Sequence, residues 1–150
     1  MNTIVLLDAG PLGIVTNPKA TPQNQACTEW LKALLAKGAR VCIPEIADYE
    51  VRRELLRANK SDGVRRLDEL KNALTYLPLT TPIMLRAAEF WAQVRQQHQP
   101  TADKKALDAD VILAAQAVSI ANPSDTVIVA TTNVGHLARL VTAYMWHEIA

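Results

Sequence analysis

Short apolar runs recur along the chain and predict buried β-strands. The first covers residues 4–7 (IVLL) and leads directly into Asp8, Ala9, Gly10 and Pro11, a sequence that predicts a turn. Runs of this length between turn-forming residues are typical of inner strands. Further strands are expected at residues 39–44, 73–79 and 126–132, with a closing edge strand at 143–149.

Apolar residues at helical spacing lie between these runs and predict helices. Within residues 25–36, Cys27, Trp30, Leu31 and Leu34 repeat every three or four positions. Further helices are expected at residues 44–59 with Pro44 in the first turn, at 64–72, from 81 onward and at 111–120, with a short helical turn at 136–141. Loops or breaks are expected at residues 17–22, 61–63, 98–108 and 122–125.

Strands that alternate with helices predict an α/β fold with a parallel sheet and helices on both faces. The length of 150 residues is typical of one domain, so we expect residues 1–150 to form a single unit. Ligands of such sheets bind outside the carboxyl ends of the strands. Asp8 follows the first strand and Asn133 follows the fourth, so both are expected at this edge. Asp8 is equally well explained as an ordinary turn residue.

Two aspartates at the start of the helix near residue 111 differ in their expected surroundings. Asp108 and Asp110 are two positions apart, so roughly 200° separates them around a helix. Gln116 lies on the same side of the helix as Asp108. Asp108 is therefore expected to be a solvated residue or a helix cap. Asp110 shares its side with Leu113 and Ala117, where an unpaired carboxylate is costly. We therefore expect either a positively charged group or a metal ion to satisfy Asp110.

The segment PEIADYEVRREL contains several acids, and periodicity does not choose among them. Glu50, Arg53, Glu54 and Arg57 form one helical stripe, which is also typical of a solvated, ion-paired face. The segment ATTNVGHL, residues 130–137, is compatible either with a site that includes Thr131 or with a polar turn before a helix.

Composition narrows the class of protein without identifying a partner. The formal net charge of +1 does not by itself indicate a nucleic-acid partner. Cys27 and Cys42 lack the spacing of a metal motif and are expected to be reduced and buried. No basic leader and no long apolar span is present in the sequence, so we expect a cytoplasmic protein without a membrane segment.

Oxygen-rich acidic clusters without His or Cys suit hard cations such as Mg²⁺ or Mn²⁺. Gly10 and Gly13 do not complete a G-x-G-x-x-G phosphate loop. A phosphatase with an aspartyl nucleophile needs a second Asp at position 10, which is Gly here. A phosphohydrolase or nucleotide-binding domain is therefore a less favoured alternative.

Four spaced segments resemble the PIN-domain ribonuclease family, close to the VapC-type toxins of toxin–antitoxin pairs: IVLLDAGPL, IPEIADYEVRREL, ALDADVILAAQA and VIVATTNVGHL. The resemblance spans nearly the whole chain and depends on the order and spacing of these segments. It implies a three-layer α/β/α domain with a central, mostly parallel sheet of about five strands. It also implies metal-dependent endonucleolytic cleavage of RNA.

The resemblance also assigns site residues. The family's first acid falls on Asp8, its glutamate on Glu50 and its third acid on Asp110, and these three would hold Mg²⁺ or Mn²⁺. The fourth position, often Asp in the family, is Asn133, which leaves a fourth metal contact open. Thr131 and Asp108 would support the site.

Basic residues beside the predicted glutamate are candidates for RNA contacts. Arg52 and Arg53 are the first of a group that includes Arg57, Lys60, Arg65 and Arg66. Acids are interspersed among them, so a solvated, ion-paired surface is the favoured interpretation. The family resemblance further implies a homodimer and a small antitoxin partner. A catalytically inactive PIN-like module that binds RNA or a protein is the main alternative, because Asn133 replaces an acid.

Overall fold

The computed structural model describes residues 2–97 and 104–150. Within these residues, five strands form one parallel sheet in the order β3-β2-β1-β4-β5. The strands are β1 (Thr3–Leu7), β2 (Arg40–Pro44), β3 (Thr75–Leu77), β4 (Thr126–Thr131) and β5 (Ala143–Met145). Every pairing is parallel, so the predicted sheet is confirmed.

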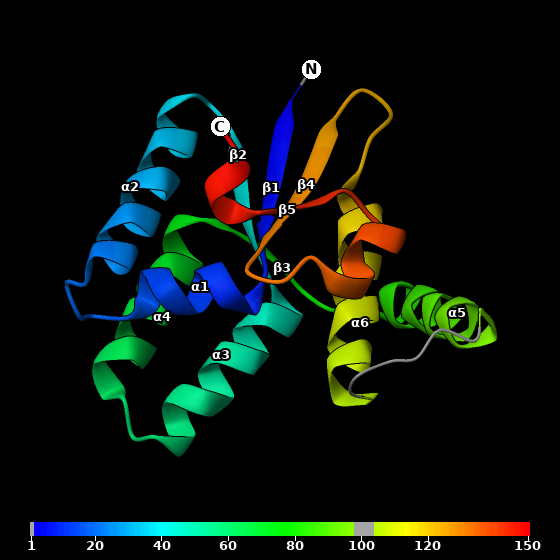
Figure 1. Ribbon diagram of the computed structural model, residues 1–150, viewed down its shortest axis with the longest axis horizontal. Helices are drawn as coiled ribbons and strands as arrows, with labels where there is room; N and C mark the ends of the chain where they lie inside the picture. The colour runs from blue at the N-terminus through cyan, green and yellow to red at the C-terminus, as the bar shows by residue number, and fades with distance from the viewer. Residues whose placement is uncertain (1, 98–103) are drawn as a thin grey trace.

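Helices cover both faces of this sheet (Figure 1). On one face lie α1 (Ala9–Thr16), α2 (Pro22–Ala36), α3 (Glu45–Arg57) and α4 (Ser61–Ala73). On the other lies α6 (Lys104–Ile120), with α5 (Thr81–Gln96) packed against it. Two short 3₁₀ helices, η1 (Gly135–Arg139) and η2 (Trp146–Glu148), flank β5. The predicted three-layer α/β/α architecture is confirmed.

Strand β1 is the centre of the sheet, and its side chains alternate between the two cores. Val5 and Leu7 pack among residues of α1, α2, α3 and α4. Ile4 and Leu6 pack on the opposite face, where Leu113 of α6 lies. This alternation follows from the two-residue period of a strand, and burial on both faces explains the uninterrupted apolar run.

Helix α6 is buried on two sides, because it lies between the sheet and α5. Gln116 was expected on a polar side of this helix, and that expectation is wrong: its side chain is fully buried. Its Nε2 donates to the carbonyl of Leu77 at 2.7 Å, and its Oε1 accepts from the N–H of Ile46 at 3.3 Å. Gln116 therefore ties α6 to the end of β3 and the start of α3.

The largest departure from the predicted elements is α1, since residues 8–11 were expected to form a turn. Asp8 is instead the N-cap of this helix, and Pro11 lies in its first turn, where no intrahelical N–H bond is lost. Leu12 and Val15 are buried one turn apart. Two glycines within eight residues weaken the helical signal, and tertiary packing stabilises the helix instead.

Other boundaries differ by a few residues. Helix α4 begins at Ser61 where a break was expected, and Gly63 lets it pack against Leu55 of α3. Helix α6 begins at Lys104 instead of residue 111, and residues 98–103 of the expected loop lie outside the described residues. Strand β5 ends at Met145, because the chain turns into η2.

None of the helices within the described residues has the length and apolar character needed to cross a membrane.

Candidate functional site

The strand order reverses between β1 and β4, and this point carries the candidate site. Chain connections leave β1 toward β2 on one side, while β4 and β5 occupy the other. Leu7 is paired with Ala130, so the carboxyl ends of β1 and β4 lie next to each other. Asp8 continues this pairing, since its N–H donates to the carbonyl of Ala130 at 2.9 Å. Such switch points are where open α/β sheets bind ligands.

Hydrogen bonds fix the carboxylate of Asp8 in place. One oxygen, Oδ1, accepts from the N–H of Ala9 at 2.7 Å as Asp8 caps α1. The other, Oδ2, accepts from the hydroxyl of Thr131 at 2.7 Å. Thr131 is fully buried, and its Oγ1 also accepts from the N–H of Asn133 at 3.1 Å. Asp8 therefore has a defined orientation set by two elements.

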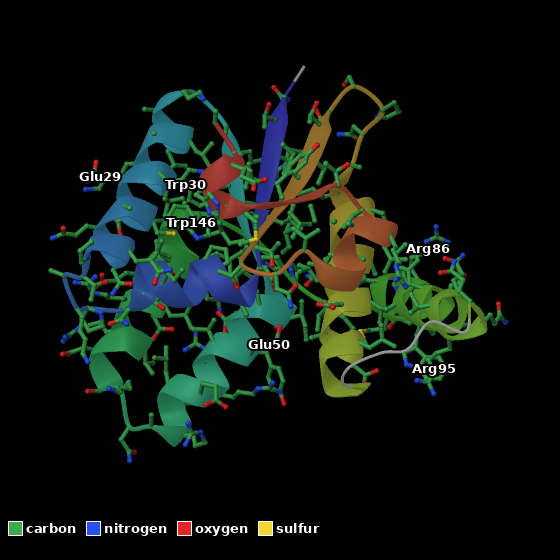
Figure 2. All side chains as sticks on the ribbon, in the orientation of Figure 1. Glu29, Trp30, Glu50, Arg86, Arg95 and Trp146 are labelled. Atoms are coloured by element: carbon green, nitrogen blue, oxygen red, sulfur yellow. The ribbon has the colours of Figure 1, made fainter. Side chains whose placement is uncertain are left out.

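Glu50 and Asp110 face Asp8 from different helices. Glu50 lies in the first half of α3, near the carboxyl ends of the strands (Figure 2). The pKa of Asp110 is raised to about 7. Burial is the largest cause of this rise, and the negative charges of Asp8 and Glu50 contribute the rest. The charges of Asp8 after β1 and of Glu50 on α3 therefore reach Asp110 on α6.

The other two carboxylates are perturbed in the same direction. Burial raises the pKa of Glu50, the charge of Asp8 adds to this, and the guanidinium of Arg53 opposes it. Burial also raises the pKa of Asp8, while the hydrogen bonds from Thr131 and Ala9 counteract the rise. Without a cation, the three carboxylates therefore repel each other and favour protonation.

The donor set fits a hard divalent cation, because all three side chains offer only oxygen. A bound cation would relieve their mutual repulsion. Among residues 2–97 and 104–150, no three His, Cys, Asp or Glu side chains are already close enough to hold a metal ion. A cation at this edge would therefore need these carboxylates to lie closer together than they do in this structure.

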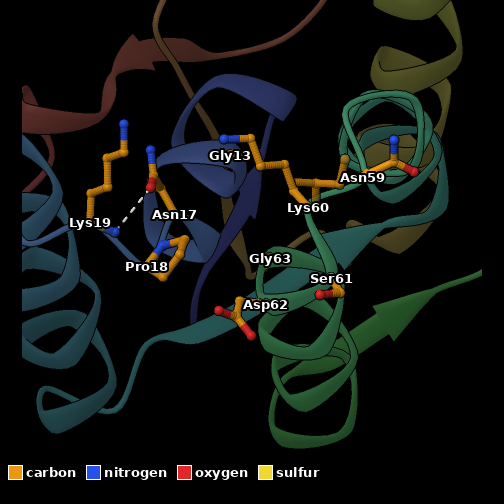
Figure 3. A pocket seen from close by; sticks show the side chains of 10 residues that line it. Gly13, Asn17, Pro18, Lys19, Asn59, Lys60, Ser61, Asp62 and Gly63 are labelled. Carbon is orange, nitrogen blue, oxygen red and sulfur yellow. Dashed lines mark hydrogen bonds between the residues drawn. The ribbon is translucent and has the colours of Figure 1, made fainter.

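A cleft of about 570 Å³ lies beside the carboxylates, with Gly10, Glu50, Arg53 and Arg57 among its lining residues. Gly13 and Lys60 contribute to this cleft and also to a neighbouring pocket of about 400 Å³. Figure 3 shows this second pocket between the end of α1 and the start of α4, where Asn17 accepts from the N–H of Lys19 at 3.0 Å.

Comparison with known proteins places this architecture in a family. The profile of the PIN domain matches residues 13–140. The chain belongs to the PIN domain family. The match includes Glu50, Asp110, Thr131 and Asn133, whereas Asp8 precedes it. None of the curated protein sequences compared with the chain matches it.

Solved structures share the fold of this PIN domain at low sequence identity. VapBC2 from Rickettsia felis, bound to a DNA fragment from its promoter, has a TM-score of 0.70 at 17% identity, over 95% of this chain and 98% of that chain. VapBC-1 from nontypeable Haemophilus influenzae has a TM-score of 0.64 at 15% identity, over 96% and 98%. DNA-bound VapBC from Salmonella typhimurium has a TM-score of 0.64 at 19% identity, over 97% and 99%.

The remaining predicted site residues of the PIN domain lie in varied surroundings. Asp108 lines a groove between α5 and α6 with Met84 and Trp91, roughly opposite to Asp110 around the helix. Asn133 is exposed in the loop after β4, and its Oδ1 lies 3.3 Å from the position that a Cβ on Gly135 would occupy. Its connection to Thr131 runs through its backbone N–H.

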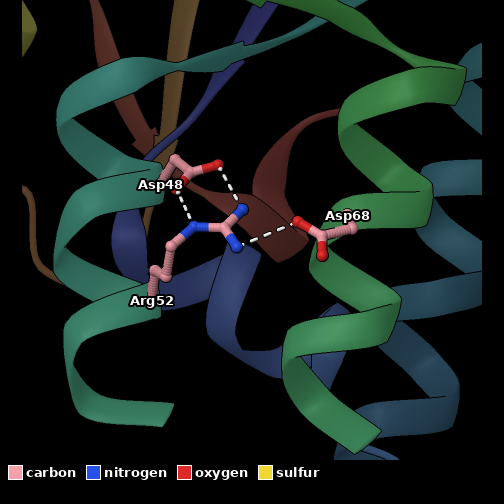
Figure 4. A network of polar contacts seen from close by, with 3 residues as sticks. All are labelled: Asp48, Arg52 and Asp68. Carbon is pink, nitrogen blue, oxygen red and sulfur yellow. Dashed lines mark hydrogen bonds and ion pairs between the residues drawn. The ribbon is translucent and has the colours of Figure 1, made fainter. Parts of the chain in front are cut away.

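Arg52, expected to contact RNA, is held in an ion-pair network (Figure 4). Its Nε and Nη2 donate to the two carboxylate oxygens of Asp48 at 2.8 and 3.1 Å. Its Nη1 lies 2.9 Å from Oδ1 of Asp68 on α4. Contact with RNA would require some of these pairs to break, so the structure favours the ion-paired interpretation for Arg52.

Glu45 and Asp48, two further candidate acids of the segment PEIADYEVRREL, have structural partners at this edge of the sheet. Glu45 accepts from the N–H of Leu79 at 2.6 Å through its Oε1, which ties the start of α3 to the chain after β3. Asp48 is buried against Arg52. The four-residue spacing of Asp48 and Arg52 was a usable signal for an ion pair, whereas the partner of Glu45 lies 34 residues away and has no local signal.

Proposed function

We propose that this PIN domain is a divalent-metal-dependent endoribonuclease, a toxin-like component of a toxin–antitoxin pair. The observation that carries the proposal is the carboxylate of Asp8, held by Thr131 at the switch point of the sheet, where its charge acts on Glu50 and Asp110. A group of half-buried carboxylates without a compensating charge is costly, and such groups are common where a cation binds.

Asp8, Glu50 and Asp110 would hold Mg²⁺ or Mn²⁺. Such a cation activates water and offsets the charge that develops on the phosphate during phosphodiester cleavage. Asp8 provides the fixed ligand, because Ala9 and Thr131 orient it. The positive charge of Arg53 faces the cleft beside Glu50 and would attract the phosphate backbone of RNA.

Cleavage of single-stranded RNA in Mg²⁺ and in Mn²⁺ tests the proposal. We expect Asp8→Asn and Asp110→Asn to lower the rate at least roughly 100-fold, because each removes a charged metal ligand. Glu29→Gln is the matched control, since Glu29 is an exposed carboxylate on α2 that pairs only with Lys32 among the described contacts. The proposal fails if the purified protein cleaves no RNA with either metal, or if the Asp8 and Asp110 variants cleave as well as the control.

The proposed antitoxin partner and homodimer are based on the similarity of the fold to VapBC structures. VapBC structures share the fold of this chain over nearly its full length, which supports a small antitoxin partner and a homodimer as proposals. A cytoplasmic location is part of the same proposal, because its RNA substrate is there. Co-expression with the product of a short adjacent gene, followed by co-purification and light scattering, would test both assemblies.

An inactive PIN-like module that binds RNA is the second candidate. Asn133, a neutral side chain in place of an acid, favours it. An RNA-binding protein without cleavage in either metal, in which Asp8→Asn leaves RNA affinity unchanged, would support this candidate over the nuclease.

A further inference from the structure

A tyrosine and an arginine lie open on α3 directly beside the candidate site. Tyr49 precedes Glu50 and keeps 56% of its surface exposed. The guanidinium carbon of Arg53 lies 5.0 Å from the centre of the Tyr49 ring. The two residues are one helical turn apart, which lets the guanidinium cover one side of the ring and leaves the rest in solvent.

Arg53 connects this pair to the carboxylates. It lines the same cleft as Glu50, and its charge lowers the pKa of that glutamate against the effect of burial. One side chain therefore contacts an open aromatic ring and also acts on a proposed metal ligand. An RNA whose phosphate reaches the carboxylates would bring a neighbouring nucleotide near Tyr49.

The other cation–ring pairs given for residues 2–97 and 104–150 lack this combination. Lys71 covers Tyr76 of β3, a half-buried tyrosine that does not line the cleft with Glu50. Arg86 covers Phe90, whose ring is 5% exposed. Arg95 covers Trp91, which is open but lies on α5 in the groove with Asp108. The ring of Tyr49 is thus distinguished by being exposed and by pairing with an arginine that lines the cleft together with Glu50.

We propose that Tyr49, with Arg53, forms a stacking surface for an unpaired base next to the cleaved phosphate of RNA. Unpaired bases stack on aromatic rings and on guanidinium planes, whereas a base inside a duplex offers no free face. The inference rests on the proposed nuclease function and assigns the side chains that would bind the base next to the cleaved phosphate.

Steady-state cleavage of a short single-stranded oligoribonucleotide tests this role. Tyr49→Leu removes the ring but keeps an apolar side chain, and we expect it to raise KM roughly tenfold with kcat nearly unchanged. Tyr49→Phe keeps the ring and should retain the wild-type KM. Tyr144→Leu is the matched control, because Tyr144 is a tyrosine of similar exposure, 49%, on β5.

A fluorescent base gives a readout that a structural defect would not reproduce. The same oligoribonucleotide carrying 2-aminopurine at successive positions is mixed with protein in EDTA, so that no cleavage occurs. We expect quenching at one position with the wild type and with Tyr49→Phe, and loss of that quenching with Tyr49→Leu.

Three results would overturn the inference while leaving the proposed function intact. They are an unchanged KM in Tyr49→Leu, an equal rise in KM in Tyr144→Leu, and a change of oligomeric state without a change in KM. A change of oligomeric state without a change in KM would show that the Tyr49 ring binds a second copy of the chain or another protein instead of RNA. Absence of any metal-dependent RNA cleavage by the wild type would instead overturn the proposed function itself, and with it this inference.

Discussion

At the scale of single residues, Asp8 combines three roles that explain why an apolar strand ends on a carboxylate. It closes the pairing of β1 with β4, caps α1 and faces Glu50 and Asp110. Thr131 holds it in this orientation from the end of β4. Outer hydrogen bonds of this kind fix the geometry of metal ligands and influence their affinity.

Removing the hydroxyl of Thr131 should therefore weaken metal binding without leaving a cavity in the core. Thr131→Val keeps the shape of the side chain, and we expect Mn²⁺ affinity to fall roughly tenfold in calorimetric titration. Thr16→Val is the control, because Thr16 is also fully buried but donates only within α1, to Leu12 and Gly13. Equal Mn²⁺ affinities of the two variants would contradict a role for Thr131 in orienting Asp8.

At the scale of elements, α1 packs closely against the end of β4, a contact between distant segments that the local sequence does not predict. A Cβ on Gly10 would lie 2.9 Å from Cβ of Thr132 and still closer to its Oγ1, so these segments touch through a glycine. The strand before Asp8 and the inward side of Asp110 were predictable from local patterns. Helix α1, the burial of Gln116 and the partner of Glu45 depend on distant contacts, which local periodicity does not contain.

Two glycines of α1 should respond oppositely to substitution by alanine. We expect Gly10→Ala to lower the free energy of unfolding by about 1–3 kcal/mol, because the new methyl group overlaps Thr132 and forces a backbone shift. Gly13→Ala should raise it by about 0.5–1 kcal/mol, since the nearest atom is 4.0 Å away and alanine favours the helix. Urea denaturation measures both, and a stabilised Gly10→Ala would contradict the close packing of α1 on β4.

The ion pairs of Arg52 join α3 to α4, and their loss should be structural. We expect Arg52→Leu to cost about 2–3 kcal/mol of stability, because it leaves the buried carboxylate of Asp48 unpaired. Arg57→Leu, which removes an exposed pair with Glu54, should cost less than about 1 kcal/mol. If Arg52→Leu instead folds normally and loses RNA affinity, Arg52 is an RNA contact, as its sequence position suggested.

At the scale of the whole molecule, the fold gathers carboxylates from distant parts of the chain and stability is reduced in return. The strand end placed Asp8 at the ligand-binding edge and the helical wheel pointed Asp110 inward, but the family resemblance was needed to join them in one group. Glu50 was assigned only through the family resemblance, because its helix carries several acids at acceptable positions. Only the folded chain shows that Glu50 and Asp8 act on Asp110.

The metal-free protein should become less stable as pH rises from about 4 to about 7. The pKa of Asp110 is about 7 in the folded protein and near the ordinary aspartate value of 3.8 when unfolded, so the folded state binds more protons in this interval. Deprotonation then costs about 1–2 kcal/mol, after allowance for the partial exposure of the group. Urea denaturation in EDTA across this range should show the fall, and Asp110→Asn should flatten it. A wild-type stability that rises with pH would contradict the repulsion among the carboxylates.

Calorimetric titration of Mn²⁺ into the metal-free protein tests the central claim most directly, because it measures the cation site without assuming a substrate. We expect saturable binding by the wild type and by Glu29→Gln, and affinity at least roughly tenfold weaker in Asp8→Asn, Glu50→Gln and Asp110→Asn. No binding by the wild type, or equal affinity in the three site variants and the control, would contradict a metal site formed by these carboxylates.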